Sequence, residues 1–479
     1  MNYIIFNPDE MRAESIGCYG HPVVRTENID RLASEGVRFD NCFVQHTACT
    51  PSRCSFMTGW YPHVRGHRTL WHALRPEDPN LFRYLRAAGY DVQWWGKNDL
   101  LSPDSFRDSV TAARHPGDAG VARNPFPSDD PRYFAFLQNP LEGKVEKHGD
   151  YRCVEGAIEY LRSGPEKPFV VYLPISSPHC PYAAFQPWHD MHDPEDLPPL
   201  RPVETTGKAD FYGEIRKSRG FDGLDEWTFR KINAVYLGMI SYVDYLLGRL
   251  LDALEETGHA DDTTVLFFSD HGDWAGDYGM VEKWWSGFDD PLTRVPLVIR
   301  APGNSAGHVV GGQVELFDIM ATILESADVE ACHTHFGRSL VPQLAGAPGA
   351  PDRAVFCEGG FDPNEPHCFE GFENRNDWLS DPTKVYFPKL KLQQEMPETA
   401  CRSAMIRTST HKLVRRSTGA HELYDLVKDP EELRNVYREL AYDSTAKNLE
   451  SSLLDWYLHT SDVVPWDEDP RGFASAQIV

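Results

Sequence analysis

One short segment of the sequence places a reactive side chain at the expected start of a helix. Cys49 is followed by Thr50, Pro51, Ser52 and Arg53. Pro51 and Ser52 suit the first turn of a helix, so we expect Cys49 near the positive end of a helix dipole. Arg53 lies one turn further on, where it can neutralise residue 49 or an anionic substrate. The segment therefore indicates a nucleophilic site for an anion.

Carboxylates and an imidazole follow two apolar segments that are expected to be strands. Asp9 and Glu10 follow the first segment, and Asp270 and His271 follow the second. Carboxylate and imidazole donors suit Ca²⁺ or Mn²⁺. Asp270 and His271 are therefore plausible ligands for one divalent ion. Asp9 and Glu10 are further candidate ligands, and for Glu10 the alternative is a solvated or arginine-paired carboxylate.

Strands alternate with helices along most of the chain. Apolar runs predict strands over residues 3–6, 37–44, 90–95, 168–173, 263–268 and 295–299. Helical spacing covers residues 28–35, 80–88, 151–162, 227–257 and 313–326. This alternation predicts an α/β fold with a mostly parallel central sheet flanked by helices. Ligands bind beyond the carboxyl ends of such strands, which is where Asp9, Lys97, His179 and Asp270 lie.

The Cys49–Arg53 segment, with Thr58-Gly59 downstream, resembles the C-x-P-S-R and T-G signature of the sulfatase family. That family depends on formylglycine and belongs to the alkaline-phosphatase-like superfamily. The resemblance implies that Cys49 is converted to formylglycine. One hydroxyl of its hydrated form attacks sulfur, and the second then expels sulfate. The implied partner is a formylglycine-generating enzyme or an anaerobic sulfatase-maturating enzyme.

Other segments resemble further parts of the same family. Asp9-Glu10 and the run Ser269–Asp273 match its two metal-binding clusters, with residue 49 as an additional metal ligand. The resemblance also implies three substrate contacts. Lys283 matches a sulfate-binding lysine, and Lys97 matches the lysine of G-K-W-H. His179 lies in a segment like P-H-x-P, and is a candidate for the general acid or a direct sulfate contact.

The sequence departs from the family where G-K-W-H is expected. Asn98 and Asp99 stand in place of the usual Trp and His. This substitution leaves the acid and the base open. Asp99 is a candidate to replace the histidine and to contact substrate, and His67 or His72 is the alternative. Each of those two histidines has a second reading as a surface or supporting residue.

The C-terminal part also resembles sulfatases. Residues 182–226 and 360–400 show little periodicity, whereas residues 404–415 and 422–426 are predicted to be strands of a second sheet. The resemblance implies that this smaller sheet is antiparallel and packs on the main domain. We therefore divide the chain into a catalytic domain, residues 1–375, and a C-terminal α+β subdomain, residues 376–479.

The leading hypothesis is a sulfuric ester hydrolase that releases sulfate from a small sulfated molecule. A carbohydrate sulfate is favoured because the motifs are surrounded by His and Trp, although core packing is the alternative role for each Trp. These are Trp71, Trp94, Trp95, Trp284 and Trp285. A phosphonate monoester or phosphodiester hydrolase on the same scaffold is the second hypothesis. A catalytically silent protein that binds a sulfated ligand is the third.

Composition excludes other classes of protein. The net charge is −25, from 72 acidic and 47 basic residues, which argues against nucleic acid as the main partner. No apolar run approaches the roughly 20 residues that cross a bilayer, and no signal peptide precedes the first strand. We therefore expect a cytoplasmic protein without membrane attachment. A homodimer is the common default for its assembly.

Overall fold

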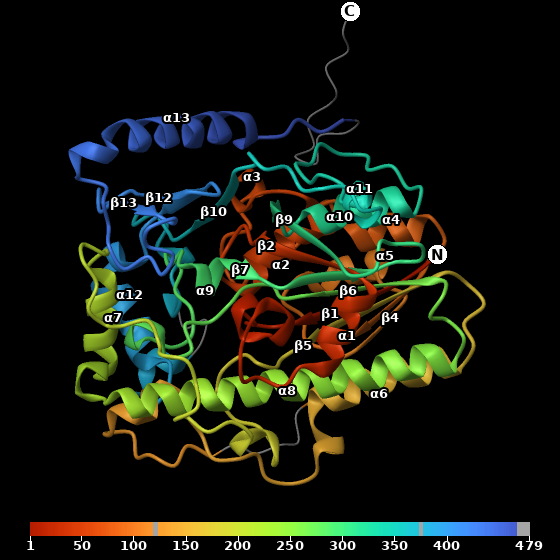
Figure 1. Cartoon of the computed structure of the whole chain (residues 1–479), viewed down its shortest axis with the longest axis horizontal. Coiled ribbons are helices and arrows are strands. Elements are labelled where there is room, and N and C mark those ends of the chain that lie inside the picture. Colours follow the sequence, from red (N-terminus) through yellow and green to blue (C-terminus); the bar gives the residue numbers. More distant parts are fainter. Residues whose placement is uncertain (118–122, 373–376, 467–479) are drawn as a thin grey trace, which may run out of the picture.

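Within residues 1–117, 123–372 and 377–466, which the computed structural model describes, nine strands form a central sheet. Their order in space is β4-β3-β5-β1-β6-β8-β2-β7, with β9 beside β2 (Figure 1). The strands are β1 (Asn2–Pro8), β2 (Val37–Phe43), β3 (Asp91–Trp95), β4 (Ala112–Arg114), β5 (Phe169–Ile175), β6 (Thr263–Phe268), β7 (Arg294–Val295), β8 (Leu297–Arg300) and β9 (His308–Glu315).

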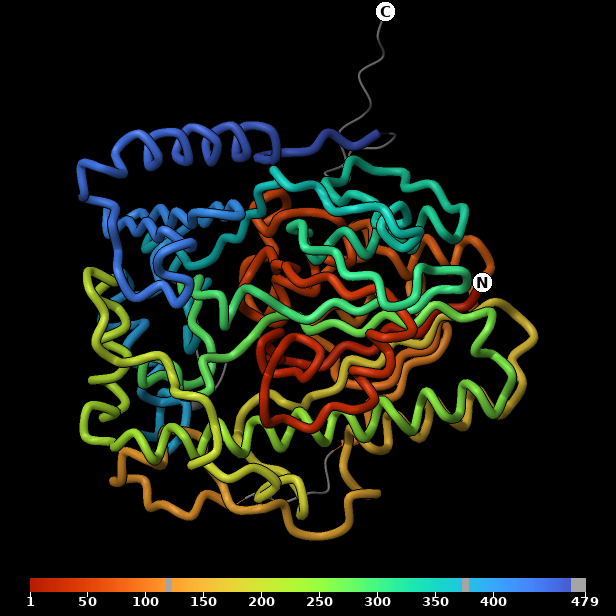
Figure 2. The backbone as a smooth tube through the Cα atoms, in the orientation of Figure 1, coloured from red at the N-terminus to blue at the C-terminus, as the bar shows by residue number. Residues whose placement is uncertain are grey.

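The centre of this sheet is parallel. β4, β3, β5, β1 and β6 run in one direction, whereas β8 is antiparallel to both β6 and β2. Every residue of β1, β5 and β6 is buried, as expected for strands that are covered on both faces. Figure 2 shows the N-terminal segment, in red, running through the middle of the molecule between later parts of the chain. The predicted mostly parallel α/β sheet is confirmed.

Two sets of helices cover the two faces of the sheet. One hydrophobic cluster includes α1 (Glu27–Glu35), α6 (Gly149–Arg162) and α8 (Glu226–Glu256). The other includes α2 (Cys49–Thr58), α4 (Leu81–Ala87) and α10 (Asp318–Ser326). By length and composition α8 could cross a membrane, but 89% of its most apolar 18-residue stretch is buried inside the protein. It is therefore a core helix.

The structure differs from the predicted elements near residue 313. Residues 308–315 form β9, which pairs with β2 in parallel, and α10 begins only at Asp318. The β-branched residues Val309, Val310 and Val314 favour a strand. The Asp318 carboxylate accepts a hydrogen bond from the Glu315 amide at 3.0 Å, which fixes the turn between the two elements. The predicted helix over 313–326 was therefore too long at its start.

A second sheet of four antiparallel strands lies beside the first. It contains β10 (Val355–Gly359), β11 (Ser403–Arg407), β12 (His411–Arg416) and β13 (Glu422–Asp425), and α13 (Asp443–Thr460) runs alongside it (Figure 1). The predicted strand over 404–415 is a hairpin of two strands. Because β10 precedes residue 376, the small sheet takes a strand from before the boundary that the sequence suggested. That boundary stays a prediction.

Buried ion pairs join the small sheet to the main domain. Lys412, on β12, contacts Asp290 at 2.6 Å and also donates to the Phe288 carbonyl at 2.8 Å. Arg407, on β11, contacts the same Asp290 carboxylate at 3.0 Å. Arg416 donates to the Ser286 carbonyl at 2.6 Å. The small sheet therefore holds the segment 286–290, which begins three residues after Lys283.

Candidate active site

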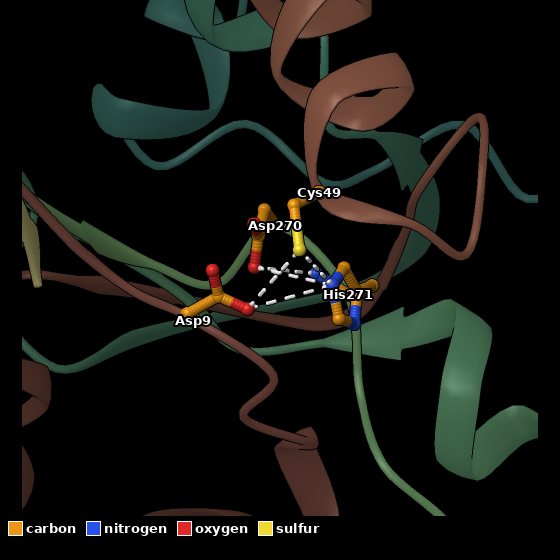
Figure 3. Close-up of side chains that lie close together, drawn as sticks. All are labelled: Asp9, Cys49, Asp270 and His271. Carbon is orange, nitrogen blue, oxygen red and sulfur yellow. Dashed lines mark hydrogen bonds and ion pairs between the residues drawn. The ribbon is translucent and has the colours of Figure 1, made fainter. Parts of the chain in front are cut away.

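The carboxyl ends of four parallel strands bring the predicted side chains to one edge of the sheet. Asp9 follows β1, Lys97 follows β3, and His179 lies four residues beyond β5. Asp270 and His271 follow β6. Asp9, Asp270 and His271 are completely buried, and Figure 3 shows them pointing toward one another and toward Cys49. The carboxyl ends of these strands therefore bring the predicted side chains together, as expected.

Cys49 is the first residue of α2, as its sequence context indicated. Its Sγ lies 3.2 Å from His271 Nε2 and 3.6 Å from Asp9 Oδ1. The helix start is held by two hydrogen bonds. The Ala48 amide donates to His46 Nδ1 at 3.0 Å, and Ser52 Oγ donates to the Asp270 carbonyl at 2.5 Å. These contacts fix residue 49 over the ends of β1 and β6.

The unmodified Cys49 thiol is poorly suited to act as a nucleophile. Burial, together with the nearby Asp9 carboxylate, raises the pKa of the thiol well above its ordinary value. Cysteine reacts as the thiolate, so a neutral buried thiol is inert at neutral pH. Without a bound cation, residue 49 is therefore uncharged as cysteine.

Arg53 bridges the two buried carboxylates. Its Nε donates to Asp270 at 2.8 Å, and its Nη2 donates to Asp9 at 3.0 Å. Its Nη1 lies 3.3 Å from Tyr172 Oη, and the side chain is completely buried. The sequence predicted that Arg53 neutralises residue 49 or the substrate, whereas the structure pairs it with Asp9 and Asp270. Tyr172, inside β5, is a supporting residue that no local motif distinguished.

Four potential metal ligands form a compact group. The ligand atoms of Asp9, Cys49, Asp270 and His271 all lie within 4.8 Å of one another. The Nδ1 of His271 lies 2.9 Å from the Gly272 carbonyl, which can only accept. Nδ1 therefore carries the proton, and the Nε2 lone pair is directed toward the group. Burial lowers the pKa of His271, which keeps the imidazole in the neutral form that a metal ligand needs. This donor set fits one divalent cation.

Glu10 lies outside that group. Both of its carboxylate oxygens lie 3.1 Å from Lys283 Nζ, and Oε2 lies 3.3 Å from His179 Nε2. The structure thus brings together Glu10, Lys283 and His179 as a second cluster beside the first. Of the two readings that the sequence left open for Glu10, a charge-paired carboxylate matches this geometry, with lysine rather than arginine as the cation.

His179 is held as a neutral ring with a defined tautomer. Its Nδ1 lies 2.5 Å from the Cys180 carbonyl, so Nδ1 carries the proton. Its Nε2 lies 2.8 Å from Lys283 Nζ and accepts from the ammonium. Burial, reinforced by the Lys283 charge, lowers the pKa of His179 to about 3. Nε2 is therefore unprotonated at neutral pH.

Lys97 and Asp99 lie at the open side of the site. Lys97 contacts Asp9 and also contacts Asp99 at 2.6 Å. The side chains of Lys97 and Asp99 keep about a quarter to a third of their surface exposed. The Asn98 side chain makes hydrogen bonds within its own loop, since its Oδ1 accepts from the Leu100 and Leu101 amides. Asp99 therefore stands where the family has a histidine, and its side chain lies near the site.

The other candidate histidines face elsewhere. His67 Nδ1 lies 2.8 Å from the His72 carbonyl, and its Nε2 lies 3.5 Å from Asp78. His72 Nδ1 lies 2.8 Å from Thr69 Oγ1. Both side chains take part in the packing of their own loop.

Most of the tryptophans near the motifs are interior residues. Trp94, Trp95, Trp284 and Trp285 are all buried, and Trp285 donates from Nε1 to Glu370 at 2.9 Å. Of the two roles considered from the sequence, substrate stacking and core packing, core packing matches the burial of these four side chains.

Glu282 is a supporting residue that no motif in the sequence indicated. It contacts Lys389 and Arg219, each at 2.7 Å, and adopts a φ of 66° just before Lys283. Lys389 comes from α12 (Phe387–Glu395) and Arg219 from α7 (Phe211–Arg219), two short helices in the regions where the sequence shows little periodicity. Distant contacts therefore set the backbone that carries Lys283.

Comparisons with known proteins agree with this site. A family model described as Sulfatase matches residues 1–329. The chain is 29% identical over 533 residues to the multifunctional alkaline phosphatase superfamily protein PehA of Trinickia caryophylli, covering 98% of this chain and 96% of that protein. It is 30% identical over 386 residues to iduronate 2-sulfatase of Mus musculus, covering 73% and 69%.

A solved structure shows the same fold over nearly the whole chain. Phosphonate monoester hydrolase of Agrobacterium radiobacter superposes with a TM-score of 0.78 at 24% identity, covering 96% of each chain. The family match to residues 1–329 contains Cys49, both strand-end clusters and Lys283. The chain therefore belongs to the sulfatase family of enzymes, within the alkaline-phosphatase-like superfamily.

Proposed function

We propose that this enzyme hydrolyses the sulfate ester of a carbohydrate and releases inorganic sulfate. The observation that carries the proposal is the compact group of Asp9, residue 49, Asp270 and His271, with Lys283 next to it. Residue 49 supplies the attacking hydroxyl once Cys49 has become formylglycine. A divalent ion bound by the group, Ca²⁺ or Mn²⁺, would supply Lewis-acid stabilisation of the anionic ester.

The charges around the site suit a monoanionic ester. Four carboxylates and three cationic side chains surround it, which leaves one net negative charge. These residues are Asp9, Glu10, Asp99, Asp270, Arg53, Lys97 and Lys283. One divalent ion would change the total to one net positive charge, which complements a single negative charge. Sulfate monoesters meet this requirement, as do phosphonate monoesters and phosphodiesters.

The hydrogen bonds of His179 bear on the choice of general acid. Since Nε2 accepts a hydrogen bond from Lys283, it has no proton to give to a leaving oxygen. The Lys283 ammonium is the hydrogen-bond donor of this pair. Although burial opposes its charge, Glu10 keeps the pKa of Lys283 above its ordinary value, so the ammonium holds its protons. We therefore assign to Lys283 a charged hydrogen bond to the ester and to His179 the orientation of Lys283, which leaves Asp99 as the titratable side chain near the opening.

The carbohydrate part of the proposal rests on a relative. The name of iduronate 2-sulfatase describes a sulfate ester on a sugar acid, and that protein matches 73% of this chain. A panel of sulfated monosaccharides and disaccharides would test it. Release of sulfate from at least one of them, faster than from an aryl sulfate, is the expected result.

A phosphonate monoester or phosphodiester hydrolase is the second candidate. Solved structures that share the fold over 96% of this chain include the phosphonate monoester hydrolases of Agrobacterium radiobacter and Silicibacter pomeroyi, which is why this candidate is kept. Initial rates on an aryl sulfate and on the matched aryl phosphonate monoester separate the two candidates, with Cys49→Ala as control. A preference for sulfate that Cys49→Ala abolishes supports the leading proposal. A preference for the phosphonate would replace it while keeping the role of residue 49.

Conversion of Cys49 has a structural requirement. Cys49 is 4% exposed, and all of α2 is buried. A formylglycine-generating or anaerobic maturating enzyme must therefore act on the chain before it folds, in our proposal in the cytoplasm. Mass analysis of the peptide containing residue 49 reports the conversion. An unmodified Cys49 from a host that has such an enzyme would instead favour a protein that only binds a sulfated ligand.

A further inference from the structure

Glu10 is next to a proposed metal ligand in the sequence but is turned away from the metal-binding group. It adopts a left-handed backbone conformation with a φ of 67°. Its amide donates to Asp270 Oδ1 at 3.2 Å, and its carbonyl accepts from Tyr236 Oη at 2.7 Å. These two bonds hold the turn from both sides. The direction of the Glu10 side chain is therefore set by the fold.

The completely buried Glu10 carboxylate meets an ammonium group instead. Lys283 Nζ lies 3.1 Å from each of its oxygens and 2.8 Å from His179 Nε2. An ammonium has three protons. One can be shared between the two oxygens of Glu10 and a second goes to His179, which leaves the third for a substrate oxygen.

The same contacts argue against a second metal ion at this place. Glu10, His179 and Cys180 offer ligand atoms within 4.8 Å of one another. However, Lys283 Nζ lies within hydrogen-bond distance of both Glu10 and His179, so a positive charge already occupies the position between them. A further cation would be repelled there.

We propose that Glu10 is a positioning residue that holds Lys283 and His179 at the substrate side of the site, and that it is not a metal ligand. This inference rests on the proposed function only for the role of Lys283 toward the ester. A buried ammonium needs a charged partner with suitable geometry, and Glu10 is the carboxylate within hydrogen-bond distance of Lys283 among the described residues. Aspartate at position 10 would be one methylene too short to keep both contacts.

Metal content and kinetics together test the proposal. We would purify the full chain and its Glu10→Gln, Glu10→Asp and Asp9→Asn variants, and measure bound metal per chain by mass spectrometry. Thermal unfolding of each variant would be followed alongside. Both Glu10 variants are expected to keep the wild-type metal content, whereas Asp9→Asn loses most of it. Glu10→Gln should lower kcat/KM for an aryl sulfate at least tenfold, and Glu10→Asp should restore only part of that loss.

A double variant separates positioning from general damage to the fold. If Glu10 acts through Lys283, then Glu10→Gln combined with Lys283→Met should be no slower than Lys283→Met alone. The double variant also removes both buried charges, so it remains informative if Glu10→Gln by itself does not fold.

Three results would overturn the inference. They are metal loss in Glu10→Gln with metal retained in Glu10→Asp, unchanged kinetics in Glu10→Gln, and additive effects in the double variant. A wild-type protein that binds metal but hydrolyses neither an aryl sulfate nor an aryl phosphonate would refute the proposed function instead. The metal measurements on Glu10 would still decide its role.

Discussion

At the scale of single residues, the site depends on charges that neutralise one another in a space closed to water. Arg53 is completely buried with Asp9 and Asp270, and each partner satisfies the others. Removing one member of such a group leaves an uncompensated charge in a medium of low polarity. The cost of a substitution therefore depends on which contact is lost.

Arg53→Lys tests this dependence. A lysine can pair with one carboxylate but cannot form the fork that spans both. We expect a loss of about 3 kcal/mol in the free energy of unfolding, together with weaker metal binding. Denaturant unfolding measures the first effect. Tyr172→Phe, which removes the contact at 3.3 Å to Arg53 and the hydrogen bond at 3.0 Å to Asn7 Oδ1 but leaves the charges in place, is the matched control with an expected loss of about 1–2 kcal/mol. Equal losses in the two variants would contradict this account.

Asp99 is the second residue for which the structure makes a prediction. Its carboxylate lies at the opening beside Lys97 and adds a negative charge where an anionic ester must enter. Asp99→Asn should lower KM for an aryl sulfate by about fivefold or less, because a partly exposed charge contributes at most about 1 kcal/mol. The KM effect should shrink as salt is added. A fall of two orders of magnitude in kcat would instead identify Asp99 as an acid or base.

At the scale of elements, α2 must place its first residue over the sheet and then end abruptly. Its last turn is closed by Gly59, which has a φ of 70° and whose amide bonds to the Ser55 carbonyl. A Cβ added at Gly59 would lie 2.8 Å from the Cβ of His335. The T-G part of the motif thus has a structural reason: this position requires both the left-handed conformation and an absent side chain.

The comparison of Gly59→Ala with Gly66→Ala separates these two requirements. Gly66 also closes a helix, α3 (Pro62–Arg65), with a φ of 77°, but no atom lies within 4 Å of an added Cβ. We expect Gly66→Ala to destabilise the protein by about 1 kcal/mol and Gly59→Ala by about 2–4 kcal/mol. Both are measured as free energies of unfolding. Similar values for the two variants would mean that the contact with His335 relaxes without cost.

At the scale of the whole molecule, the small sheet takes part in building the site. Its strands hold the backbone from Ser286 to Asp290, a few residues beyond Lys283, through Lys412 and Arg416. Although burial opposes ionisation, Arg407 and Lys412 keep the pKa of Asp290 below its ordinary value. A lowered pKa stabilises the fold at neutral pH, and this contribution is lost as the pH falls below about 4.

Asp290→Asn should therefore weaken the attachment of the small sheet to the main domain. We expect a loss of about 3 kcal/mol at neutral pH, and a smaller difference from the wild type as the pH is lowered below about 4. Unfolding experiments over a range of pH measure both. Lys428→Ala, which removes a mostly exposed partner of Asp425, is the control and should change stability by less than about 1 kcal/mol. A constant difference at all pH values would exclude the Asp290 charge as the cause.

The sequence by itself determined the parallel core and the positions of the reactive groups. Apolar runs in β1, β5 and β6 are read locally, and parallel strands must present their carboxyl ends at one edge. For this reason Asp9, Asp270, His271 and His179 were found from their places after strands. The start of α2 at Cys49 followed from Pro51 and Ser52, which act within a single helical turn.

The tertiary structure alone decided where the side chains in the loops point. Asp270 and Tyr236 turn Glu10 toward Lys283, and these partners lie 260 and 226 residues away along the chain. β9 is a second case, because its pairing with β2 makes residues 313–315 a strand although the local spacing predicted a helix from residue 313. A local pattern reports the period of an element and the residue that ends it. It does not report which distant group will compensate a buried charge, and that compensation fixes the geometry of this site.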